Sequence, residues 1–172
     1  YCLICGKDHD SKPALTCGPS CDTIIRLNPP KIVDIPSDHV SFVSVANQFK
    51  RSWRHPSKRC PIVRRVFSII PPRKVVSRYE DYQRQVEIRG NFAAHGRSAG
   101  NENRRWHGTK RDCSLGERGQ MQPCVSPTCS TCCIIRNSFD LRFFKGRTGW
   151  GRFGRGIYTS ATSSKADDYS CN

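Results

Sequence analysis

The chain has 172 residues and a net charge of +15, and 36% of its residues are hydrophobic. This length suffices for one domain with a small appended module. The chain has no run of about 18 apolar residues that would predict a membrane-spanning helix. Residues 50–111 hold most of the charge, with 17 Lys and Arg against four Asp and Glu. A basic region attracts polyanions such as nucleic acid or a ligand with a pyrophosphate, and the alternative is a basic surface without a dedicated partner.

Cysteines and prolines divide the first part of the chain. Residues 1–27 form a cysteine-bearing module, and the Asn-Pro-Pro run at 28–30 predicts a break, because proline lacks an amide donor and restrains the residue before it. We therefore expect a second, larger domain over residues 28–172. Residues 38–53 predict a helix, since their apolar residues recur at helical spacing, and either Ser37 or Asp38 is expected to cap it.

The elements expected further along are short. Residues 62–70 are rich in β-branched residues and predict a strand, and the apolar spacing of residues 76–90 predicts a second long helix. Two short strands are expected at residues 105–108 and 157–159. Short helices are expected over residues 134–139 and 163–170, with a basic, glycine-rich loop at 145–153 between them.

The 11 cysteines favour metal sites over a closed set of disulfides, because their number is odd and their spacing suits zinc. The first group consists of Cys2, Cys5, Cys17 and Cys21. Four thiolates would give tetrahedral zinc, and so short a segment has few core residues to fold without a metal. Reduced, solvent-facing thiols are the alternative, and His9 is a substitute ligand. Zinc-bound thiolates suit a reducing compartment, so we expect an intracellular protein, nuclear or cytoplasmic.

A second zinc is predicted further along the chain. Its candidate ligands are Cys113, Cys124, Cys129 and Cys132. Five cysteines compete for four positions, and Cys133 is expected to face the core instead. Cys60 and Cys171 have no obvious partners and are expected to be structural. Both sites would be closed by four thiolates, which leaves no open coordination position for catalysis.

Two short motifs carry the predicted chemistry, Trp-His-Gly-Thr at 106–109 and Gly-Arg-Gly-Ile-Tyr at 154–158. The imidazole of His107 can bond a ribose hydroxyl, and the Gly108 backbone can approach a carboxamide closely. Tyr158 and Tyr169 could hold a flat ring between them. Taken singly, each feature is more typical of a strand-end histidine or a core tyrosine.

Taken in order, these motifs resemble the catalytic domain of poly(ADP-ribose) polymerase-like ADP-ribosyltransferases, most closely the fungal zinc-bearing branch. The resemblance covers nearly the whole chain and includes residues 52–56, 79–82, 100–109, 149–158 and 163–165. It implies an α+β fold with the family's split antiparallel sheet, here incomplete at its C-terminal end, and a small N-terminal zinc module. It also implies NAD+ as the substrate.

The resemblance also assigns roles to single residues. His107 and Tyr158 match two members of the family's catalytic His-Tyr-Glu triad. The residues expected to contact NAD+ are His107, Gly108, Thr109, Tyr158, Ser164 and Tyr169. The glycine-rich loop at 145–153 matches the loop that closes over the donor, and Ala166 stands where many members have a serine. Every glutamate precedes Tyr158, so we expect the chain to be a piece of a longer protein whose triad glutamate follows Asn172.

The expected function is therefore NAD+-dependent ADP-ribosyl transfer, a glycosyltransferase reaction that breaks the nicotinamide–ribose bond. Mono-transfer to a protein or nucleic-acid acceptor is expected ahead of polymer formation. One alternative is NAD+ hydrolysis, with water as the acceptor. The other is a catalytically inert, basic zinc module that binds nucleic acid through residues 50–111.

Overall fold

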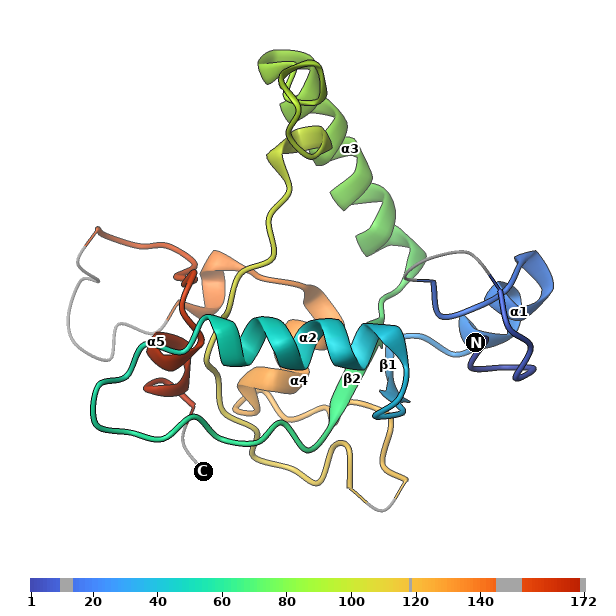
Figure 1. Ribbon diagram of the computed structural model, residues 1–172, viewed down its shortest axis with the longest axis horizontal. Helices are drawn as coiled ribbons and strands as arrows, with labels where there is room; N and C mark the ends of the chain where they lie inside the picture. Colours follow the sequence, from blue (N-terminus) through green and yellow to red (C-terminus); the bar gives the residue numbers. More distant parts are fainter. Residues whose placement is uncertain (10–13, 118, 145–152, 171–172) are drawn as a thin grey trace.

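The computed structural model describes residues 1–9, 14–117, 119–144 and 153–170, which form an α+β arrangement around a two-stranded antiparallel sheet (Figure 1). In chain order the elements are α1 (Pro19–Ile25), β1 (Lys31–Ile35), α2 (Val40–Arg51), β2 (Val66–Ile70), α3 (Arg73–Gly90), α4 (Ser130–Asn137) and α5 (Ser163–Asp167), with 3-10 turns at Ala93–His95, Ala99–Asn101 and Leu141–Phe143. No helix within the described ranges is long and apolar enough to cross a membrane.

The sheet joins β1, which the sequence analysis did not predict, to a shortened β2. Lys31 pairs with Ile70 and Ile35 pairs with Val66, so five residues of each strand are matched. Pro30 precedes β1 and Pro36 follows it, and neither can donate to a ladder. The predicted strand 62–70 is therefore wrong at its start, because β1 offers it no partner before Val66.

The helices agree with the predicted positions, with differences at their ends. The predicted cap of α2 is wrong, because His39 occupies the position and its Nδ1 accepts the N–H of Ser41 at 3.1 Å. α3 begins at Arg73, directly after Pro72, three residues earlier than predicted. α4 begins at Ser130 and ends at Asn137, because Ser138 has a φ of 62° that no helix can contain.

Cysteines make up much of the small core. Among the described residues, four of the ten buried apolar side chains are cysteines, and two of these, Cys129 and Cys132, are fully enclosed at 0% exposure. They pack with Ile32 of β1, Leu115 and Ile135 of α4. A core this poor in large apolar side chains gains little from burial, so a structural metal would add most to its stability.

α3 projects from the body of the molecule as an arm and carries the two turns at 93–101 at its tip (Figure 1). None of its 18 residues is buried. The carboxylate of Glu87 accepts the N–H groups of Ala93 at 2.9 Å and of Gly100 at 2.7 Å. Gln83 adds a bond to Glu102 at 2.9 Å. Two polar side chains of α3 therefore hold the tip against the helix.

We expect the tip of this arm to loosen in acid. The N–H groups of Ala93 and Gly100 lower the pKa of Glu87 below its ordinary value, with burial as a smaller, opposing cause. A lowered folded-state pKa stabilises the fold above the unfolded-state value of about 4.3, and this stabilisation disappears as pH falls through the folded-state pKa. The protection factor of the Gly100 amide against hydrogen exchange should therefore fall below about pH 4. Glu87→Gln should remove this pH dependence, whereas Glu80→Gln should leave it intact.

Candidate functional site

The two predicted motifs lie side by side. The N–H of Trp106 donates to the carbonyl of Ser160 at 2.9 Å, and the N–H of Ser160 donates back at 2.8 Å. This is a single antiparallel bridge. The strands predicted at 105–108 and 157–159 are therefore wrong as strands, since Trp106 alone pairs in the first segment and its partner Ser160 lies just beyond the second. The bridge nevertheless brings together motifs about 50 residues apart in the chain.

Trp106 attaches this bridge to the C-terminal half of α2. Its indole N–H donates to the hydroxyl of Ser52 at 3.0 Å, and its ring meets Phe49 edge to face at 5.4 Å. An edge-to-face contact is favourable because the positive edge of one ring lies against the negative face of the other. α5 joins the same point, because the hydroxyl of Ser163 donates to the carbonyl of Phe49 at 2.7 Å. α2 thus supports both sides of the bridge.

His107 is exposed and held in one tautomer. Its Nδ1 lies 2.9 Å from the carbonyl oxygen of Tyr158, and because a carbonyl only accepts, Nδ1 must carry the hydrogen. In the neutral imidazole this leaves Nε2 as an acceptor. Phe139 packs against the ring at 5.0 Å in an edge-to-face contact. The ring is therefore oriented to accept a hydroxyl hydrogen of a ligand.

Tyr158 presents a partly exposed ring beside His107. Its hydroxyl donates to the carbonyl of Gly154 at 2.6 Å and accepts the N–H of Phe153 at 3.1 Å. Phe144 lies nearly parallel to the ring, 6.5 Å away between centroids. The hydroxyl thus anchors the glycine-rich segment that precedes it. The remainder of the predicted donor loop, residues 145–152, lies outside the described residues.

Gly108 lets α5 approach the bridge. A Cβ built there would lie 1.8 Å from the carbonyl oxygen of Ala166 and 3.0 Å from the Cβ of Tyr169. No side chain fits, so glycine is required by the close packing of the two segments. Tyr169 is thereby held beside Gly108, with 65% of its surface exposed. Thr109 is half-buried next to it.

Ser164 has a different position from the one expected. It is buried at 6% exposure, and its hydroxyl oxygen accepts the N–H of Arg54 at 3.1 Å. Its contact is with the end of α2, which gives no support to the predicted contact with NAD+. The structure therefore places His107 against Tyr158 and Gly108 against Tyr169, and it buries the Ser164 hydroxyl against Arg54.

Three glutamates form hydrogen bonds or ion pairs outside this site. Glu87 and Glu102 belong to the arm, where they bond the tip and Gln83. Glu117 forms an ion pair with Arg111. None of these three carboxylates is bonded to His107 or Tyr158.

No known protein-family model matches the chain, and no curated protein is similar to it in sequence.

The first candidate metal centre lies in the N-terminal module. The Sγ atoms of its four cysteines all lie within 4.8 Å of one another. Cys17 is 3.6 Å from Cys5 and 3.7 Å from Cys21 between sulfurs. Zinc with Zn–S bonds of about 2.3 Å requires tetrahedral edges of about 3.8 Å, whereas a disulfide requires about 2.05 Å. The geometry therefore fits a metal ion. Cys2 also accepts the N–H of Ile4 at 3.4 Å, as a thiolate would.

The second candidate centre lies in the core. The Sγ atoms of Cys113, Cys124, Cys129 and Cys132 also lie within 4.8 Å of one another. Cys113 is 3.7 Å from Cys129 and 3.5 Å from Cys132. The structure thus brings together the two predicted quartets, both compatible with structural zinc. Cys133 faces the backbone carbonyls of residues 126 and 127 instead. Cys171 lies outside the described residues.

The thiols of each quartet differ in acidity. Burial raises the pKa of Cys2, but nearby backbone N–H groups outweigh it and lower the pKa to about 6. In the second quartet the same balance lowers the pKa of Cys129 to about 7. Burial and neighbouring thiols raise the pKa of Cys21 to about 12, and they also raise the pKa of Cys132. In each quartet one cysteine loses its proton readily and another does not. A bound cation is therefore needed to keep all four cysteines as thiolates.

Proposed function

We propose that the chain carries the NAD+ site of an ADP-ribosyltransferase, on a scaffold held by two structural zinc ions. The observation that carries the proposal is the pairing of His107 with Tyr158, with Gly108 and Tyr169 beside them. The histidine ring offers an acceptor for a ribose hydroxyl, and the tyrosine rings offer apolar faces for nicotinamide.

Bond cleavage in NAD+ develops positive charge on the ribose, as in glycoside hydrolysis. His107 would orient the sugar through its Nε2, because the Tyr158 carbonyl holds the opposite nitrogen protonated. A carboxylate must stabilise the developing charge, and the three hydrogen-bonded glutamates of the described residues are engaged elsewhere. The described residues therefore account for donor binding and orientation, and the proposal is tested first at that step.

The test compares NAD+ binding to the protein and to two histidine variants. His107→Ala should weaken binding about tenfold or more in isothermal calorimetry, because it removes the only ring placed to accept from the ribose among the residues described at this site. His95→Ala is the matched control, since His95 is also exposed but lies at the tip of the α3 arm. Equal NAD+ affinity in both variants would contradict the proposal.

Turnover separates the possible reactions. NAD+ labelled in its adenosine half should transfer label to a protein or nucleic-acid acceptor, and the transfer should fall with His107→Ala but not with His95→Ala. Release of nicotinamide with the label recovered only as free ADP-ribose would instead assign NAD+ hydrolysis. Absence of NAD+ binding to the unaltered protein would leave the basic zinc module as the better description.

A further inference from the structure

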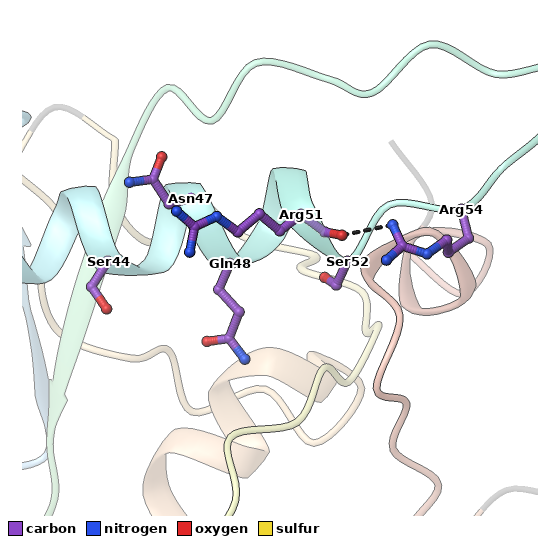
Figure 2. A pocket seen from close by; sticks show the side chains of 6 residues that line it. All are labelled: Ser44, Asn47, Gln48, Arg51, Ser52 and Arg54. Atoms are coloured by element: carbon purple, nitrogen blue, oxygen red, sulfur yellow. Dashed lines mark hydrogen bonds between the residues drawn. The ribbon is translucent and has the colours of Figure 1, made fainter.

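An open groove of about 410 Å³ runs along the C-terminal half of α2 (Figure 2). Its lining is polar or cationic throughout and includes no acidic residue. The lining residues are Ser44, Asn47, Gln48, Arg51, Ser52 and Arg54. Hydroxyls, carboxamides and guanidinium groups are the side chains that most often contact phosphate and sugar oxygens.

Two arginines of the groove are arranged differently. Arg54 folds over the end of α2, where its Nη1 donates to the carbonyls of Arg51 at 2.6 Å and Trp53 at 2.9 Å. Arg51 lies back along the helix towards Asn47 (Figure 2), and its guanidinium bonds no described residue. Arg51 is exposed. Its donors are therefore available to a ligand in the groove, and Arg54 has further N–H groups beside it.

A third guanidinium borders the groove. The Nη1 of Arg104 donates to the Oε1 of Gln48 at 2.9 Å and approaches the hydroxyl of Ser44 at 3.4 Å. Three arginines from two segments thus surround the same polar surface without an acidic residue in its lining. Charge of this kind, concentrated over a hollow, raises the local concentration of anions.

The groove lies on the opposite side of the bridge from the proposed NAD+ site. Successive residues of an extended segment point to opposite faces. Trp106 points to Ser52, which lines the groove, whereas His107 points to Phe139 and Tyr158. A ligand in the groove would therefore leave the His107 face open.

The basic surface continues beyond the groove. The loop at 54–65 leaves the C-terminal end of α2 and runs beside the helix (Figure 1). It carries the exposed cations Arg59 and Arg64, together with Lys58, which is paired with Asp167. Arg64 lines a second hollow of about 300 Å³ at the N-terminal end of α2 together with Arg65, which is paired with the Asp34 carboxylate of the same lining. Cations thus follow the length of the helix, which suits a polymer rather than a small anion.

We propose that this surface binds single-stranded nucleic acid through its sugar–phosphate backbone. A basic groove that tracks the backbone is the usual means of holding a single strand. The concentration of charge in residues 50–111, the polar lining and the continuation along the loop all favour this ligand over a small phosphate compound. The inference does not depend on NAD+ binding, because the groove and the proposed NAD+ site lie on different faces of the bridge.

The test uses one charge reversal and its matched control. Arg51 and Arg89 are both exposed and both lie in the last turn of a helix, Arg51 in α2 and Arg89 on the arm. Arg51→Glu and Arg89→Glu therefore change net charge and helix-end electrostatics equally. Binding of a fluorescent, mixed-sequence 20-nucleotide single strand is measured by anisotropy between 50 and 300 mM salt. His107→Ala is included to separate this site from the NAD+ site.

Arg51→Glu should weaken binding about five- to tenfold, and the slope of log K against log salt should become shallower by about 0.7 or more. Arg89→Glu and His107→Ala should each change affinity less than about twofold. Equal losses in the two arginine variants would overturn the proposal in favour of diffuse attraction. Binding of poly-glutamate, inorganic pyrophosphate or a duplex as tight as that of the single strand would overturn the assignment of the ligand.

Discussion

Replacing Cys132 by serine is expected to unfold the centre of the molecule. Cys132 has no exposed surface and packs with Ile32, Leu115 and Ile135, so its sulfur belongs both to a metal quartet and to the core. Structural zinc contributes about 10–16 kcal/mol in small zinc domains, whereas a whole domain is stable by only about 5–15 kcal/mol. Loss of this ion should therefore remove the cooperative unfolding transition.

The measurement is thermal unfolding by circular dichroism, with bound zinc determined by native mass spectrometry. Cys133→Ser is the matched control, because Cys133 is the next residue of α4 and is also buried but lies outside the quartet. Its sulfur contacts backbone carbonyls, to which a serine hydroxyl can also donate. A cooperative transition in Cys132→Ser with one zinc fewer than in Cys133→Ser would show that the ion is dispensable.

The first quartet should behave differently from the second. Cys5 is exposed, and its module contacts the body through Tyr1, whose carbonyl bonds His39 at 3.2 Å and whose hydroxyl donates to Asp38 at 2.9 Å. Cys5→Ser should accordingly release one zinc and disorder the N-terminal module while the transition of the core persists. The two substitutions together separate a local role of zinc from a global one.

Replacing Trp106 by alanine is expected to lower the free energy of unfolding by about 2–4 kcal/mol. Truncation of a large aromatic residue in a core costs about 3–5 kcal/mol, and Trp106 is half-buried. The substitution removes the packing on Phe49 and the bond to Ser52 together. Trp106→Phe keeps an aromatic ring but loses the hydrogen bond and part of the indole packing, which should cost about 1–2 kcal/mol.

Urea unfolding measures these differences, and the imidazole NMR signals of His107 report on the site itself. Trp106→Ala should alter the signals of His107, since the bridge to Ser160 would lose its support from α2. Trp53→Phe is the control for loss of an indole donor, because the Trp53 N–H bonds the carbonyl of Lys58 in an exposed loop. Equal destabilisation by Trp106→Ala and Trp106→Phe would contradict packing as the main contribution.

Local spacing explains what could be predicted of this fold. Cysteines separated by two or three residues can share one metal, and this spacing predicts the first quartet and the Cys129–Cys132 half of the second. Apolar residues at helical spacing located α2 and α3, because a helix depends on neighbours within four residues. The strand β1 was missed, since five residues between two prolines carry too short a pattern to distinguish.

Contacts between distant segments explain the errors. The cap of α2 is a histidine because Tyr1 supplies a carbonyl for its second nitrogen, which no local pattern predicts. Ser164 was expected at the ligand, and it is buried because the end of α2 lies over it. Both outcomes depend on how helices pack rather than on their own sequences.

The sequence by itself determined the two groups of cysteines that could hold a metal, the long helices and the order of the His-Gly and Gly-Ile-Tyr motifs. Only the tertiary structure decided that Trp106 pairs with Ser160, that the Tyr158 carbonyl sets the tautomer of His107, and that arginines gather over a groove behind them. The physical reason is the separation in sequence between the residues that interact. Metal ligation and helix formation follow from residues a few positions apart, whereas the site is made by segments that meet only when the core has packed.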